Sequence, residues 1–358
     1  MRGADMGQVE MLVAFSLEDR VPADHPLRTI RRLADGALRE MRSVLTTMYS
    51  HTGRPSIPPE RLIRALLLQV LFSIRSERQL VEQLHYNLLY RWFVGMGIEE
   101  QVWDATTFTR NRQRLIDADA GRALMGAILS QARRQKLLSD EHFSVDGTLI
   151  EAWASHKSFQ SKDDDPPAGG AGDFRGQRRT NDTHASITDP QARSYRKAPG
   201  QEARLAYLGH ALMDSRHGLV VDGCATQATG TAERDAAGQM IDRIKRAAEL
   251  TLAADKGYDA QAFVEHLTRA RVRPHIAQNT ANRRSAVPDA IACSPGYAKS
   301  ISARRKIEDI FGWLKRVGGL RKVKLRGVAK VDSLFTFALA AYNLVRMRTL
   351  LMPQPQSV

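Results

Sequence analysis

Cysteine is almost absent from this sequence: Cys224 and Cys293 are the only two in 358 residues. They stand far apart, outside any C-x-x-C or Cys/His cluster, so neither a disulfide framework nor a structural zinc site is expected. The sequence also lacks a run of about 18 apolar residues, which a membrane-spanning helix requires. No signal peptide is recognisable at its start. These absences predict a soluble cytoplasmic protein.

Acidic residues are scarce relative to basic ones. The 39 Asp and Glu stand against 53 Lys and Arg, which gives a formal net charge of +14 and a pI of about 10.1. Such an excess predicts a polyanionic partner, and without a membrane segment it favours nucleic acid over a lipid surface. A hydrophobic content of 43% supports real cores, and the length allows two domains.

Helical periodicity dominates the first 138 residues, which we expect to form an all-helical domain. Pro26 starts one amphipathic helix, and Ser76 with Gln79 forms a capping box for another. The expected helices cover 24–41, 60–74, 76–93, a short stretch opened by Asp104 and Thr107, and 120–138.

Three arginines, Arg110, Arg112 and Arg114, crowd the short helix that follows Asp104. They could form a solvated helix face with no special role. The excess of positive charge in the whole chain favours the other reading, in which this helix contacts a DNA backbone or groove. We therefore expect residues 1–138 to bind DNA and to support multimerisation.

From His142 onward the pattern changes to strands alternating with helices. Strands are expected near 143–153, on either side of a turn at 214–218, at 251–255 and from Arg273. Helices are expected up to about Glu249, after a cap at Asp259, around Glu308 and from Val331. This order predicts a mixed five-stranded sheet with helices on both faces over residues 139–358. The Gly/Pro/Asp-rich segment at about 157–200 is expected to be a flexible surface loop.

The stretch Ile301–Lys315 is expected to be a single helix. Arg304, Glu308 and Lys315 would then share one stripe, because residues three and four apart lie on the same face. Between Lys299 and Lys330 there are eleven Lys and Arg against two acids. A surface helix with ordinary ion pairs would explain the stripe. A functional carboxylate among phosphate-binding cations would also explain it, and indicates metal-assisted chemistry on nucleic acid.

Two further acids occupy informative positions: Asp146 lies within the first expected strand and Asp255 at the end of the fourth. If these strands are neighbours, the two carboxylates project side by side, and the basic helix can bring Glu308 to them. Three converging carboxylates repel one another, and a divalent cation relieves the repulsion. Oxygen ligands favour Mg²⁺ or Mn²⁺, and two such ions support phosphoryl transfer.

Each acid also has an ordinary explanation. Asp146 could cap a turn beside Gly147, and Asp255 could pair with Lys256. Asp222 is another acid at a strand end, and physical arguments alone do not exclude it. We rank it below Asp255 because no turn and capped helix follow it so closely.

Several motifs resemble one known family. They are VDGTLIEAWASHKSF around Asp146, THASITDP and GTAERDAA after it, AADKGYD around Asp255 and RRKIEDIFGWLKR around Glu308. The chain resembles DDE transposases of the bacterial insertion-sequence-five family, within the insertion-sequence-four-like superfamily. The superfamily signature Tyr-x2-Arg-x3-Glu-x6-Lys matches at Arg304, Glu308 and Lys315, with Ile301 in place of the tyrosine.

The resemblance implies an RNase H-like fold in which Asp146, Asp255 and Glu308 are the catalytic and metal-binding triad. It implies cleavage of double-stranded DNA at inverted repeats, joining of the freed 3′-OH to target DNA, and a homodimer or larger multimer that pairs two ends. Arg304 and Lys315 would hold the phosphate backbone. There are two competing hypotheses: a non-catalytic DNA-binding repressor or domesticated remnant, and a metal nuclease that acts on RNA or structured DNA without strand transfer. The intact acids favour the active transposase.

Overall fold

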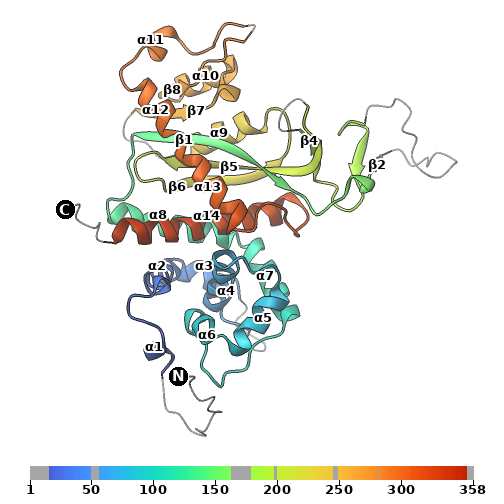
Figure 1. The fold of residues 1–358 in the computed structure, drawn as a ribbon, viewed down its shortest axis with the longest axis vertical. Coiled ribbons are helices and arrows are strands. Elements are labelled where there is room, and N and C mark those ends of the chain that lie inside the picture. The colour runs from blue at the N-terminus through green and yellow to red at the C-terminus, as the bar shows by residue number, and fades with distance from the viewer. Residues whose placement is uncertain are drawn as a thin grey trace, which may run out of the picture.

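A computed structural model describes the chain in layers (Figure 1), with a group of helices, a sheet, and two long helices between them. The described residues are 16–49, 56–162, 179–196, 200–244, 249–281 and 283–352. The central part of the predicted loop at 157–200, residues 163–178, lies outside them.

The helical layer comes from the N-terminal part of the chain. Its helices are α1 (Leu17–Arg20), α2 (Pro26–Glu40), α3 (Arg42–Thr47), α4 (Pro59–Leu71), α5 (Glu77–Tyr86), α6 (Leu88–Val94), α7 (Ala105–Asp117) and α8 (Ala120–Arg134). The predicted caps are confirmed: Pro26 opens α2, and Ser76 Oγ accepts a hydrogen bond from the Gln79 amide at 3.1 Å. The helix predicted over 76–93 is in fact two, because the Asn87 side chain caps a new helix by accepting from the Tyr90 amide at 3.2 Å.

The sheet layer is mixed, as predicted, but it has six strands instead of five. The strands are β1 (His142–Glu151), β4 (Arg193–Tyr195), β5 (Arg204–Asp214), β6 (Val220–Gln227), β7 (Leu250–Ala254) and β8 (Val272–Ile276). The order is β4-β5-β1-β7-β8, with β6 also paired to β5. The first and fourth predicted strands, β1 and β7, are parallel neighbours, which was the condition for bringing Asp146 and Asp255 together.

The sixth strand comes from the segment predicted as a loop. β4 pairs antiparallel with the start of β5, while β2 (Phe159–Ser161) and β3 (His184–Ser186) form a separate two-stranded sheet beside a 3-10 turn, η1 (His156–Ser158). Each of these strands is three residues long, which is too short to carry an alternating pattern in the sequence. The described parts of 157–200 therefore contain regular structure that composition did not indicate.

The remaining elements surround the sheet. They are α9 (Ala232–Arg243), η2 (Lys256–Tyr258), α10 (Gln261–Arg269), α11 (Asp289–Ala292), α12 (Tyr297–Ala303), α13 (Lys306–Arg316) and α14 (Val328–Leu351). The cap predicted at Asp259 is wrong. Ala260 precedes α10, and the Asp259 carboxylate instead accepts hydrogen bonds from the Asn279 and Ala286 amides at 2.7 and 2.8 Å. The Asp259 carboxylate is buried, and it stabilises the loop that contains Asn279 and Ala286 instead of the N-terminus of α10.

The helix predicted over Ile301–Lys315 is also divided. α12 ends at Ala303 and α13 begins at Lys306. At the junction the amides of Ile307 and Glu308 bond to carbonyls only three residues back, each at 3.0 Å, which is the tighter 3-10 pattern. Glu308 and Lys315 still share one helix, but Arg304 belongs to the turn before it.

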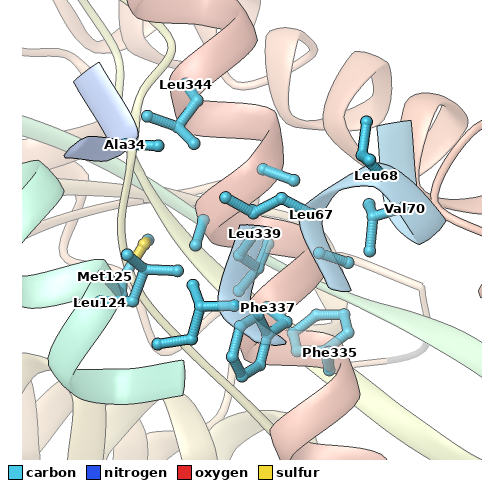
Figure 2. Close-up of a cluster of buried hydrophobic side chains, with 14 of the residues drawn as sticks. Ala34, Leu67, Leu68, Val70, Leu124, Met125, Phe335, Phe337, Leu339 and Leu344 are labelled. Atoms are coloured by element: carbon cyan, nitrogen blue, oxygen red, sulfur yellow. The ribbon is translucent and has the colours of Figure 1, made fainter. Parts of the chain in front are cut away.

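The core joins the helical layer to the sheet through α14. Figure 2 shows Phe335, Phe337 and Leu339 of this helix among side chains of the N-terminal helices, including Leu67 and Leu124. On the sheet side, a Cβ added to Gly209 of β5 would lie 2.5 Å from the Phe335 ring, so glycine permits the close approach. α14 is the one described helix long and apolar enough to cross a membrane, and 56% of its most apolar window is buried inside the protein. The two predicted domains therefore share one core.

Candidate active site

Asp146 lies in β1, and Asp255 directly follows β7, the parallel strand beside β1. The paired register of these strands ends at Ser144 and Ala253, and Asp146 and Asp255 each lie two residues beyond that pair. Residues directly opposite in neighbouring strands point to the same face, and the strands are about 4.8 Å apart. Both side chains are partly exposed. The prediction that these two carboxylates project side by side is thus consistent with the pairing of the strands.

A buried tyrosine marks the place where negative charge collects. Burial raises the pKa of Tyr258 well above its usual range, and the charges of Glu233, Asp146 and Asp255 raise it further. The Tyr258 hydroxyl is buried and has no hydrogen-bond partner in the described part of the chain. It is therefore a neutral donor enclosed near three carboxylates. The sequence analysis did not identify Tyr258, although it lies only three residues after Asp255.

Arg304 lies against the first of these acids. One of its terminal guanidinium nitrogens is 3.5 Å from Asp146 Oδ2, and the two side chains are only 17% and 19% exposed. Asp146 therefore has a cationic partner that was not predicted from the sequence. Because the α12–α13 turn brings Arg304 to Asp146, it also fixes the start of α13 beside β1.

Glu308 follows Arg304 by four residues and lies in the first turn of α13. Ile307, Ile310 and Leu314 are buried and hold α13 on the core, while Glu308 is exposed. The Glu308 carboxylate makes no hydrogen bond or ion pair with any described residue. Lys315 is half-buried, seven residues further along the same face of α13.

The donor chemistry at this place suits a hard divalent cation. Asp146, Asp255 and Glu308 offer only carboxylate oxygens, the ligands that Mg²⁺ and Mn²⁺ prefer. Among the residues that the structure describes, no three Asp, Glu, His or Cys side chains lie close enough together to hold one metal ion. The three carboxylates come from separate elements: Asp146 from β1, Asp255 from the residue after β7, and Glu308 from α13.

Glu233 is a further acid near Asp146, and it was not singled out from the sequence. It stands in the first turn of α9, and a Cβ added to Gly147 would lie 2.7 Å from its Oε1. Glycine at position 147 therefore lets a carboxylate reach the β1 backbone next to Asp146. The sequence signal for this close approach to β1 is the pair Asp146-Gly147, in which a residue without a side chain follows the acid.

Asp222, the alternative second acid, lies on the far side of β5. It belongs to β6, and its carboxylate is bound by Arg243 at 2.8 Å and lies 3.6 Å from Arg122. Two guanidinium groups already compensate its charge. This supports the choice of Asp255, which has no ion pair among the described residues and instead accepts a hydrogen bond from the Gly257 amide at 2.8 Å.

The three arginines of α7 differ in their surroundings. Arg112 is turned toward α5, where it forms an ion pair with Glu77. Arg114 is exposed, lies over the Tyr49 ring at 5.6 Å and donates to Asn111 at 3.2 Å. Arg110 is exposed and is not bound to any described residue. The helix therefore presents Arg110 and Arg114 to solvent and uses Arg112 in packing.

Comparison with family models gives two matches. The model described as "Transposase DDE domain" matches residues 138–344, which include Asp146, Asp255 and Glu308. The model described as "Transposase domain (DUF772)" matches residues 15–114. No curated protein matches the chain.

Solved structures give distant likenesses. A piggyBac transposase synaptic complex with hairpin DNA is similar over 90% of this chain and 75% of that chain, with 9% identity and a TM-score of 0.40. A Mos1 strand transfer complex is similar over 84% and 79%, with 12% identity and a TM-score of 0.20. A Mos1 mariner paired-end complex with Mn is similar over 92% and 97%, with 13% identity and a TM-score of 0.20.

Proposed function

Because the transposase DDE domain model covers more than half of it, the chain belongs to the family of DDE transposases, and we propose how its residues carry out that activity. The protein is a DNA transposase, a metal-dependent enzyme that cleaves and joins DNA. More narrowly, we propose a transposase of the insertion-sequence-five type that acts at the inverted-repeat ends of its element. It would free a 3′-OH at each end and join it to target DNA.

The pairing of β1 with β7 is the observation that carries the assignment of the site. It supports Asp146 and Asp255 as the first two catalytic carboxylates, because each follows the last paired residues of β1 and β7, Ser144 and Ala253, by two positions. Glu308 is the third, on the helix that starts beside β1. We propose that these three residues hold Mg²⁺ or Mn²⁺, with two ions in each site. Such ions activate the attacking oxygen and stabilise the leaving oxygen in phosphoryl transfer.

The surrounding residues have supporting tasks in this proposal. Tyr258 stays neutral because its pKa is raised, so its hydroxyl can donate a hydrogen bond to a neighbouring carboxylate and orient it. Arg304 has five N–H donors, so contact with Asp146 leaves others for a phosphate oxygen. Lys315, on the same face as Glu308, would contact the DNA strand further along. These two cations position the strand and do not ligate metal.

The helical layer is the proposed DNA-binding and multimerisation part. Residues 1–138 would recognise the element ends, with Arg110 and Arg114 as exposed contacts and Arg112 positioning α7 through Glu77. Transposition brings two ends together, so we propose a homodimer or larger multimer on DNA. Because DNA is its substrate, we propose that the protein acts in the bacterial cytoplasm, in association with the nucleoid.

The test is single-turnover cleavage of a duplex that contains the DNA flanking this reading frame. We expect strand cleavage at the repeat and joining of the 3′-OH end in Mg²⁺ or Mn²⁺, and neither product in EDTA. Asp255→Asn should abolish both products while the protein still binds the duplex. Undiminished cleavage in chelator would overturn the proposed metal chemistry, and cleavage without joined products would favour a nuclease.

A further inference from the structure

A groove in the helical layer gathers arginines from distant parts of the sequence. It has a volume of 690 Å³ and is lined by Arg28, Arg31, Arg32, Arg39, Arg42 and Arg64. Three acids, Glu18, Asp35 and Glu60, also line it. Six guanidinium groups against three carboxylates leave a formal excess of three positive charges. The groove plays no part in the active site described above.

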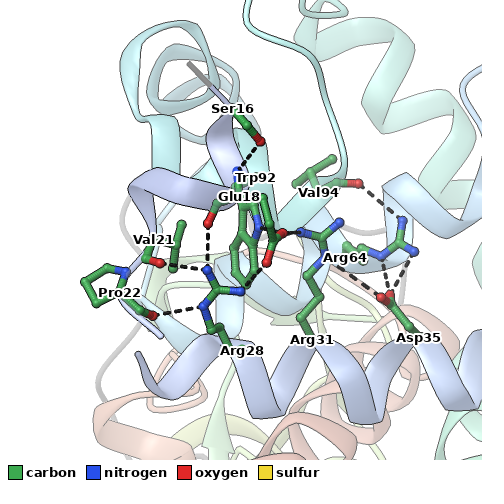
Figure 3. A network of polar contacts seen from close by, with 10 residues as sticks. All are labelled: Ser16, Glu18, Val21, Pro22, Arg28, Arg31, Asp35, Arg64, Trp92 and Val94. Atoms are coloured by element: carbon green, nitrogen blue, oxygen red, sulfur yellow. Dashed lines mark hydrogen bonds and ion pairs between the residues drawn. The ribbon is translucent and has the colours of Figure 1, made fainter. Parts of the chain in front are cut away.

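Three of these arginines form a fixed inner wall (Figure 3). Arg28 pairs with the Glu18 carboxylate and donates to the Val21 carbonyl at 2.7 Å. Glu18 in turn accepts from Trp92 Nε1 at 2.6 Å, and Arg31 stacks over the Trp92 ring at 4.5 Å. Arg64 binds Asp35 at 2.8 Å on the other side. The cations of this wall are held in position by acids, carbonyls and an aromatic ring.

Three other arginines form an open rim. Arg32, Arg39 and Arg42 are exposed and make no ion pair with a described residue. From Arg28 to Arg39 the groove follows eleven residues of α2, or ~16 Å of helix. One strand of duplex DNA has a phosphate for every ~3.4 Å of helix axis, so this length covers roughly five phosphates.

The inner wall holds three guanidinium groups, those of Arg28, Arg31 and Arg64, against two carboxylates, Glu18 and Asp35. Burial lowers the pKa of Arg31, while the carboxylates of Asp35 and Glu18 raise it and the guanidinium groups of Arg64 and Arg28 lower it. An anion entering the groove would relieve this crowding. Guanidinium groups suit phosphate well, because their planar N–H pairs match two phosphate oxygens.

We propose that this groove binds the sugar–phosphate backbone of duplex DNA, with Arg32, Arg39 and Arg42 as direct phosphate contacts and the inner wall as their support. The inference rests on the proposed function, since it supplies a second place where the transposase holds its substrate. It assigns backbone binding to α2 in addition to α7. Phosphate contacts fix position and register and carry little base specificity.

The test measures DNA affinity of the full-length protein over a salt series, without added metal so that cleavage does not run. The triple variant Arg32→Gln/Arg39→Gln/Arg42→Gln should bind a duplex more weakly, and its log–log salt slope should be shallower by roughly 0.9 per phosphate contact, about 2.7 in all. A triple Arg→Lys variant at the same positions should keep most of the slope, because it keeps the charges. The matched control replaces Arg269, Arg271 and Arg273, exposed at the α10–β8 end of the molecule (Figure 1), and should change the slope little.

An unchanged salt slope in the groove variant, or an equal change in the control, would overturn the proposal. Unaltered DNA binding by the groove variant, together with loss of its binding to polyglutamate, would also overturn the proposal. That result would indicate an acidic protein partner for the groove. The thermal melt of each variant shows whether the fold is kept. Failure of the groove leaves the active site separately testable: if Asp255→Asn still abolishes cleavage, the proposed function stands without this surface.

Discussion

Replacing Arg304 by glutamine separates two roles of the active-site cations. In the structure the Arg304 guanidinium is 3.5 Å from the Asp146 carboxylate, where it compensates the charge that a metal ion would also compensate. The substitution removes the charge and keeps a polar side chain of moderate length. We expect Arg304→Gln to bind Mn²⁺ more tightly than the wild type and to cleave DNA more slowly.

The magnitude follows from the geometry. Two unit charges at this separation attract each other by about 5 kcal/mol at an effective dielectric constant of ~20. Loss of solvation offsets much of that attraction, so the net contribution of the pair is about 1–3 kcal/mol. Each 1.4 kcal/mol corresponds to about a tenfold change in affinity. Without metal the variant should also be less stable, because Asp146 loses the nearby charge of Arg304.

The assay is Mn²⁺ titration by calorimetry without DNA, combined with thermal melts at several Mn²⁺ concentrations. The variant should show about 5- to 150-fold tighter binding and a larger rise in Tm with metal. Arg305→Gln is the matched control, because Arg305 is the adjacent, exposed arginine and lacks an ion pair with any described residue. Equal Mn²⁺ affinity in the wild type and Arg304→Gln would refute the competition between guanidinium and metal.

Three other predictions concern the fold that supports the site. Gly209→Ala should lower the free energy of unfolding, measured by urea denaturation, by about 1–3 kcal/mol, because its Cβ would meet the Phe335 ring at 2.5 Å. A Cβ at Gly230 would have nothing within 4 Å, so the control Gly230→Ala should change it little. Equal effects of the two substitutions would contradict this prediction. Burial lowers the pKa of His210 to about 4, so the unfolded chain binds a proton that the folded protein excludes, and stability should fall by about 3 kcal/mol between pH 6.5 and 4. His210→Gln should flatten that pH dependence, and an unaltered profile would exclude His210 as its source. A fragment that ends at Leu138 lacks α14 and exposes the faces that pack on it, so circular dichroism should show no cooperative melt; a sharp melt would show that the helical layer folds alone.

The positions of the two aspartates could be predicted because strand patterns are local. β-branched residues identify β1, and a short apolar run identifies β7. These strands are parallel neighbours, and Asp146 and Asp255 each lie two residues beyond their last pair, Ser144 and Ala253. The two strands that carry these acids could therefore be predicted from the sequence, and the roles of the acids stay a prediction.

The other half depends on contacts between distant segments. Arg304 and Arg305 are good helix formers, so nothing local indicates that α12 ends before them. The turn between α12 and α13 lies where Arg304 contacts Asp146, which precedes it by more than 150 residues in the sequence. Glu233 reaches β1 only because α9 packs on the sheet above Gly147. Helix propensity and hydrophobic periodicity are local properties, so they cannot predict such contacts between distant segments.

The groove illustrates the same limit. Its residues come from α1, α2, α4 and α6 and from the turn that starts α3, and none of these segments is unusual alone. The sequence analysis selected α7 because three arginines stand close together there. In the folded chain, Arg112 of that cluster is used in packing, while dispersed arginines assemble on α2. Net charge predicted a polyanionic partner, but only the fold distributes that charge over the surface.

Single-turnover cleavage of element-end DNA by four acid variants tests the central claim most directly. Asp146→Asn, Asp255→Asn and Glu308→Gln should each abolish cleavage in Mg²⁺ and in Mn²⁺ while the protein keeps its melting temperature within a few degrees and still binds DNA. Asp222→Asn removes the charge of a strand-end acid that Arg243 and Arg122 already compensate, so it should cleave DNA at close to the wild-type rate. Loss of cleavage in Asp222→Asn with normal cleavage in Asp255→Asn would contradict the site described here.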